Sequence, residues 1–163
     1  MRKGYALFEV LIFIVLFTSM SLAFMTVFIS VMRINVRQSS AAEVNGQAQF
    51  LLTTIEQEVM QAASIDDITD PGTLTMHPAP ADFARDPVEI SLIGTTVYLQ
   101  EAGGTPEPLT SQKVKVDALT FTKQENPSAR DVVSVLFTMS YNSQSPQQQY
   151  TRTLRTSIQK LNP

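Results

Sequence analysis

Hydrophobic and polar positions divide the chain into three stretches with different spacing. The first, residues 10–32, is an unbroken apolar run of 23 residues without charge, Gly or Pro. Its only polar residues carry hydroxyl groups: Thr18, Ser19, Ser21, Thr26 and Ser30. A helix of this length extends about 35 Å, enough to cross a bilayer core, and hydroxyls that bond to carbonyls of their own helix are tolerated in lipid. The run predicts a membrane-spanning helix.

The second stretch has helical periodicity. Between residues 44 and 62, apolar residues recur every three or four positions, with Gln and Glu between them. This spacing gives an amphipathic helix with one apolar face. We therefore expect one long helix from about Tyr5 to Ala63, in which residues 33–63 pack on the rest of the protein. Gly46 weakens this helix locally and is a candidate position for a bend.

The third stretch, residues 64–163, contains short segments in which apolar and polar residues alternate, as in half-buried strands. The expected strands are residues 74–76, 88–92, 97–100, 114–121, 133–141 and 150–158. Gly94 and Thr95 are expected to form a two-residue hairpin turn, and Asn126–Ser128 a further turn. The alternation slips near Asp117 and Ala118, which predicts a bulge. The fold class is therefore α+β: a long N-terminal helix packed on an antiparallel meander of four to six strands.

The composition of the chain excludes several classes of metal and catalytic sites. Only 17% of the residues are charged and 44% are hydrophobic, whereas about 25% charged residues are usual in soluble domains. The chain has no Cys and one His, which excludes disulfides, thiolate metal sites and centres with several histidines. The sequence also lacks a Gly-rich phosphate loop, a nucleophile elbow and metal-ligand spacing. We expect neither a catalytic residue nor a cofactor.

Three carboxylates in the loop after the long helix, Asp66, Asp67 and Asp70, are weak candidates for a calcium site, because hard oxygen ligands suit Ca²⁺. The loop has no EF-hand spacing, and turn or helix-ending roles explain the same residues. His77 has no evident partner in the sequence and is expected to be an exposed loop residue.

Charge is unevenly distributed along the chain. Residues 38–112 contain eleven acids and one base, whereas residues 113–163 contain seven bases and three acids. The two regions can neutralise each other within one molecule, or acidic and basic surfaces of neighbouring molecules can dock. The sequence leaves both possibilities open. The net charge of −3 makes nucleic acid an unlikely partner.

The residues before the apolar run are more specific. Arg2 and Lys3 precede Gly4, and Glu9 lies at the edge of the apolar run. A cleaved secretory signal has an apolar region of only about 7–15 residues, so an ordinary signal peptide fits poorly. A simple membrane anchor fits the length, but it does not explain Glu9. A carboxylate at the edge of lipid is costly unless it has a partner, which makes it a functional candidate.

This N-terminus resembles the class III signal of type IV prepilins and pseudopilins: a basic leader ending in Gly, an aromatic residue, and Glu as the fifth residue after the cut. Two features depart from the family pattern. Tyr5 stands where the family prefers Phe, and Thr18 and Thr26 stand where many major pilins carry Gly and Pro. The second departure favours a pseudopilin or a minor pilin, and the strand pattern after residue 113 is loosely similar to that of J-type minor pseudopilins.

The resemblance implies cleavage between Gly4 and Tyr5 by prepilin peptidase, N-methylation of Tyr5, and assembly through Glu9. It divides the chain into a leader (1–4), a transmembrane and assembly segment (5–32), an amphipathic helix (33–63) and a β-rich head (64–163), the pilin-like lollipop shape.

The same resemblance implies a location and partners. The precursor would lie in a bacterial inner membrane, with the N-terminus in the cytoplasm and the head in the periplasm or outside. After processing, it would join other pilins or pseudopilins in a filament through an inner-membrane assembly platform, serving secretion, pilus formation or DNA uptake. The alternative is a single-pass anchored β domain that binds a periplasmic or cell-wall partner.

Overall fold

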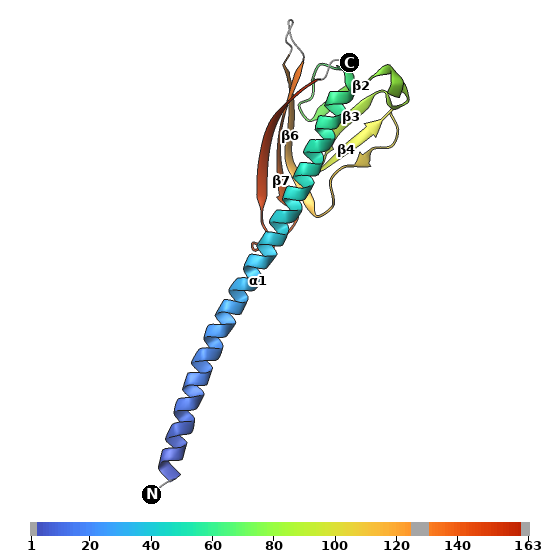
Figure 1. The fold of residues 1–163 in the computed structure, drawn as a ribbon. Coiled ribbons are helices and arrows are strands. Elements are labelled where there is room, and N and C mark those ends of the chain that lie inside the picture. Colours follow the sequence, from blue (N-terminus) through green and yellow to red (C-terminus); the bar gives the residue numbers. More distant parts are fainter. Residues whose placement is uncertain (1–2, 125–130, 161–163) are drawn as a thin grey trace.

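The computed structural model describes residues 3–124 and 131–160, and within these ranges the side chains of all residues except 3–6, 80 and 81. A single helix, α1, runs from Lys3 to Gln61 and spans about 88 Å over its 59 residues. Its second half lies against a β-rich head, and its first half projects away from the head as a stem (Figure 1). The predicted helix is confirmed to within two residues at each end. It continues through Gly46 without a break in its helical assignment.

The head contains two antiparallel sheets. The first has the order β1-β2-β3-β4-β5. Its strands are β1 (Ala62–Ile65), β2 (Thr73–Pro78), β3 (Val88–Ile93), β4 (Thr96–Glu101) and β5 (Glu107–Pro108), and the 3-10 helix η1 (Pro80–Arg85) connects β2 to β3. The hairpin between β3 and β4 turns at Gly94 and Thr95 as expected. Gly94 has a φ of +66° and Thr95 is not left-handed, as a type II′ turn requires.

The second sheet has the order β6-β7-β8. Its strands are β6 (Val114–Gln124), β7 (Val132–Tyr141) and β8 (Thr151–Gln159). The pairing of β6 with β7 shifts between Val116 and Ala118, which confirms the predicted bulge. The predicted turn at Asn126–Ser128 lies outside the described residues. The predicted α+β fold class, a long N-terminal helix packed on antiparallel β structure, is confirmed. The expected single meander of four to six strands is wrong, because the described residues form eight strands in two sheets.

The core of the head lies where α1 meets the two sheets. Helix residues at three- and four-residue spacing are fully buried there: Val44, Ala48, Leu51, Ile55 and Val59. They pack with alternate residues of the strands, such as Leu74, Ile90, Phe121 and Phe137, in one cluster. Backbone hydrogen bonds also join the sheets, from the N–H of Val116 to the carbonyl of Thr95 at 2.9 Å and from that of Phe121 to Pro71 at 2.8 Å. The predicted apolar face of residues 33–63 is therefore confirmed from Ser40 onward.

Two lysines bind the chain just beyond the end of α1. Lys123 of β6 donates to the carbonyl of Ile65 at 3.0 Å, and Lys160, after β8, donates to the carbonyl of Ala63. Both acceptors belong to β1, which directly follows α1. The second sheet is thus connected to the end of α1 by polar contacts as well as by packing.

Candidate functional site

The stem, residues 7–39, carries most of the exposed large apolar side chains among the described residues. Every side chain from Leu7 to Ser39 is exposed, including large apolar ones such as Leu16 and Phe17 at 63% and 64%. This helix is long and apolar enough to cross a membrane, with a mean hydropathy of 2.4 in its most apolar window. Water disfavours so much contiguous apolar surface, so lipid or other apolar helices around the stem would stabilise it.

Four hydroxyl groups of the stem, those of Thr18, Ser19, Thr26 and Ser30, donate to carbonyls of their own helix. Thr18 donates to the carbonyl of Ile14 at 2.6 Å, Thr26 to that of Leu22 at 2.6 Å, and Ser30 to that of Thr26 at 2.9 Å. Hydroxyls bonded in this way need no water and no neighbouring helix. These bonds make the uncharged run of the stem, residues 10–32, compatible with lipid.

Glu9 is the one acid in the stem. It lies on the exposed helix surface two residues after Leu7, and no described side chain forms an ion pair with it. The expected cleavage position between Gly4 and Tyr5 lies in the first turns of α1. The structure therefore has the three predicted processing and assembly residues on one helical segment, where a partner for Glu9 would have to come from outside the described side chains.

In the head, Arg85 at the end of η1 connects three elements. Its Nη2 lies 2.8 Å from Glu58 Oε1 on α1 and 2.6 Å from Glu101 Oε1 on β4. The hydrogen bond to Glu101, followed by that to Glu58, raises the pKa of Arg85 above its ordinary value. These contacts hold η1 close to the last turn of α1, at the end of the head farthest from the N-terminus (Figure 1). This group was not predicted from the sequence, because Glu101 and Glu58 are 16 and 27 residues away from Arg85.

The expectation for His77 is wrong. It lies within β2, is half-buried, and has a carboxylate at each ring nitrogen. Nδ1 lies 2.5 Å from Asp86 Oδ1, and Nε2 lies 3.2 Å from Asp66 Oδ1. The hydrogen bond to Asp86 is the main cause of a pKa raised above the ordinary value, with Asp66 adding to it and burial opposing it.

The three calcium candidates have different partners. Asp66 contacts His77, Asp67 lies 3.1 Å from Lys123 Nζ, and Asp70 accepts from the N–H of Gly72 at 3.0 Å in a turn. Within residues 3–124 and 131–160, no three acid, His or Cys side chains are arranged to hold a metal ion. The turn role that the sequence left open for these residues is what the structure displays for Asp70.

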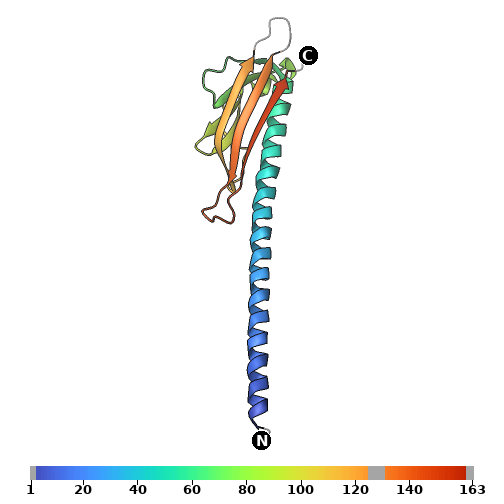
Figure 2. The same ribbon diagram turned by 90° about the vertical axis from the view of Figure 1, so that its left-hand side faces the viewer.

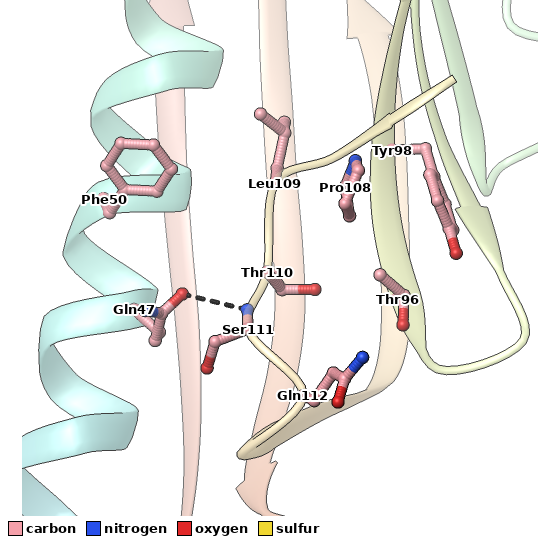
Figure 3. Close-up of a pocket in the computed structure, with 9 residues that line it drawn as sticks. All are labelled: Gln47, Phe50, Thr96, Tyr98, Pro108, Leu109, Thr110, Ser111 and Gln112. Carbon is pink, nitrogen blue, oxygen red and sulfur yellow. Dashed lines mark hydrogen bonds between the residues drawn. The ribbon is translucent and has the colours of Figure 1, made fainter. Parts of the chain in front are cut away.

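A groove of about 560 Å³ lies between α1 and the segment that follows β4 (Figure 3). Its lining residues are Gln47, Phe50, Thr96, Tyr98, Pro108, Leu109, Thr110, Ser111 and Gln112. The N–H of Ser111 donates to Gln47 Oε1 at 3.3 Å across its floor. The hydroxyl of Ser111 also donates to Glu43 Oε1 of α1 at 3.5 Å, so two polar contacts join this segment to the helix.

The acidic and basic regions of the sequence meet in part within one molecule. Lys123 binds Asp67, and Lys113 lies 4.0 Å from Glu43 while remaining 69% exposed. Arg152 instead donates to the neutral Asn45 at 2.5 Å, and no described acid pairs with Arg155 on the exposed side of β8. The internal pairing is therefore real but incomplete among the described residues.

Comparisons with known proteins identified no relative of this chain. No protein-family model, no characterised protein and no solved structure matches the chain.

Proposed function

We propose that the chain is a structural subunit of a type IV pilus-like filament, as a minor pseudopilin or a minor pilin. The observation that carries this proposal is the stem: a straight apolar helix, exposed from Leu7 to Ser39, continuous with the helix that forms the core of the head, and bearing the single acid Glu9 near its start. The basic leader ending in Gly4 supports it independently.

The proposed mechanism follows from electrostatics in a medium of low dielectric constant. Cleavage after Gly4 exposes an α-amine on Tyr5, and both this cation and the Glu9 anion are unfavourable in lipid when isolated. Pairing relieves both, because Coulomb attraction is strong where water is excluded. Glu9 of one subunit therefore binds the terminal amine of its neighbour. This pairing sets the axial register of helices whose apolar surfaces would otherwise slide past one another.

The proposal includes a sequence of partners. Membrane lipid surrounds the stem of the precursor in the inner membrane, with the head on the outer side. Prepilin peptidase then removes residues 1–4, and the assembly platform transfers the subunit into a filament with other pilins or pseudopilins. In the filament, neighbouring helices replace lipid around the stem.

Mass spectrometry of the intact protein from its native cells tests the processing step. We expect a chain that begins at Tyr5 and carries one added methyl group on its terminal amine. A chain that begins at Met1 would contradict the proposal and favour the alternative, a single-pass anchored domain that binds a periplasmic or cell-wall partner. Substituting Gly4→Val should block processing and supplies the control for cleavage at this site.

The assembly role of Glu9 is tested with a matched pair of substitutions on the same helix. Glu9→Gln should enter the membrane and be processed, yet fail to join filaments, because the terminal amine of the neighbour loses its counter-charge. Glu56→Gln makes the same change in the head, where no described side chain forms an ion pair with Glu56, and should assemble normally. Normal assembly of Glu9→Gln would mean that Glu9 pairs with its own amine or extends to the headgroups.

A further inference from the structure

His77 occupies a position between two segments that are otherwise separate. Asp66 begins the loop between β1 and β2, and Asp86 directly follows η1 in the short connection to β3. Each carboxylate faces a different nitrogen of the same ring, at 3.2 Å and 2.5 Å. The side chains of His77 and Asp66 are 37% and 56% exposed, whereas that of Asp86 is only 19% exposed. The imidazole is therefore the bridge between the loop and η1.

The number of N–H groups on the ring decides whether this bridge can hold. A neutral imidazole has one N–H and one lone pair, so it can donate to only one of the two carboxylates. Its lone pair would face the oxygen of the other carboxylate, which accepts but cannot donate. The imidazolium ion has an N–H on both nitrogens and satisfies Asp66 and Asp86 together. Both contacts in the structure thus require the protonated ring.

Other charged groups surround this bridge but do not replace it. Arg85 is adjacent to Asp86 in the chain, and its guanidinium is already bound to Glu58 of α1 and Glu101 of β4. Asp67 is adjacent to Asp66 and is bound to Lys123 of β6. On the strand that pairs with β2, Glu89 lies opposite Thr75. Asp82 in η1 is exposed. Arg85 stays charged at any physiological pH, so among these contacts the His77 bridge is the one that titrates near neutrality.

We propose that His77 is a proton-operated latch that joins the β1–β2 loop to η1 when the ring is protonated and releases Asp66 when the ring is neutral. Asp66 is the partner released, because Asp86 is the nearer and more buried acceptor and keeps the remaining N–H on Nδ1. The loop, residues 66–72, keeps its turn contacts, the contact of Asp67 with Lys123 and the backbone hydrogen bonds that Pro71 and Gly72 accept from Phe121 and Leu92. The release therefore loosens the start of the loop, at Asp66. This proposal does not depend on the proposed function.

The sign of the pH effect follows from the raised pKa of His77. The protonated ring is favoured in the folded head, so its stabilising contribution is complete below the ordinary His pKa of about 6.5. The contribution is lost as pH rises through the higher pKa of the folded state. The latch is therefore closed in mildly acidic medium and opens toward alkaline pH.

The experiment uses NMR on the full chain in detergent micelles, where His77 gives the only imidazole signals because the sequence contains one His. The ring should titrate with a midpoint above 6.5 and become the Nδ1–H tautomer at high pH. The amide of Asp66, which donates to Thr75 O at 3.1 Å, reports the loop. Its hydrogen-exchange protection factor should fall by about three- to tenfold across the midpoint, as one charge-assisted contact is lost.

Two substitutions separate the latch from general effects of charge. Asp66→Asn should lower the midpoint of His77 and remove the pH dependence of loop protection. Asp82→Asn removes the same charge from exposed η1 and should change neither quantity. A midpoint at or below 6.5, or loop protection that does not follow the titration of His77, would overturn the latch. So would an equal response of the two variants.

Discussion

The two halves of α1 form one continuous helix but bury their side chains in opposite ways. In the stem, from Leu7 to Ser39, every described side chain is exposed, and the apolar ones point in all directions. From Ser40 onward, burial recurs every third or fourth residue, where the helix meets the sheets. The half of α1 in the head packs on apolar strand residues of the same chain, whereas the apolar residues of the stem pack on no other described element. The comparison shows that one continuous helix serves two purposes, with a single apolar face in the head and apolar residues on all sides of the stem.

This difference predicts that substituting the same residue type changes the free energy of unfolding of the head when the residue lies in the head and not when it lies in the stem. The same substitution can therefore be made once in the stem and once in the head, and its effect on unfolding of the head compared. The full chain in detergent micelles, unfolded by urea and followed by near-UV circular dichroism, supplies the measurement for each pair below.

The largest difference is expected for leucine. Leu51→Ala should destabilise the head by about 2–5 kcal/mol, because Leu51 is fully buried between α1 and the sheets and its loss leaves a cavity. Leu16→Ala removes the same atoms from a side chain that is 63% exposed, and should leave unfolding of the head unchanged. Equal effects of the two substitutions would show that the stem and head are not energetically separate.

A smaller difference is expected for threonine. Thr110 is 5% exposed, and its hydroxyl accepts from the N–H of Val97 at 3.2 Å. Thr110→Val keeps the shape but leaves this buried N–H without its partner, at a cost of about 2 kcal/mol. Thr26→Val removes a hydroxyl that bonds only to carbonyls of its own helix and should not affect the head. A stable Thr110→Val variant would mean that Val97 finds another acceptor.

The smallest difference is expected for arginine. Arg85→Gln should cost about 1 kcal/mol, because Arg85 is partly exposed and its two carboxylates can regain water. Arg37→Gln changes an exposed residue at the head-proximal end of the stem, for which the described residues supply no ion pair, and should be neutral. High salt should reduce the Arg85 effect and leave Arg37→Gln neutral.

Much of the fold was predictable because its signals are local. The periodicity of α1, the alternation in β3, β4, β7 and β8, and the slip at the β6 bulge are all properties of neighbouring residues. The β1 strand was not predicted, because its four residues (AASI) owe their extended form to pairing with β2. The β5 strand has only two residues, too few to show alternation, and it is a strand because it pairs with β4. The division into two sheets depends on pairings that no local pattern specifies.

The candidate residues divide in the same way. Glu9 was recognisable because it interrupts the apolar pattern at its edge. The partners of His77 are nine and eleven residues away, in segments that the sequence identifies only as loops. Turn signals predict that a chain reverses, but they do not predict which side chains meet across the reversal. The ion-pair group at Arg85 was missed for the same reason.

The alignment of α1 with the second sheet has a mechanical consequence. The helix runs beside β8 over much of the length of the head, and Figure 2 shows the two nearly parallel. Tension applied to the stem would therefore load this contact in shear, so that many side chains resist sliding at once and none is peeled away first. The lysine contacts beyond Gln61 lie at the far end of that path and would share this load.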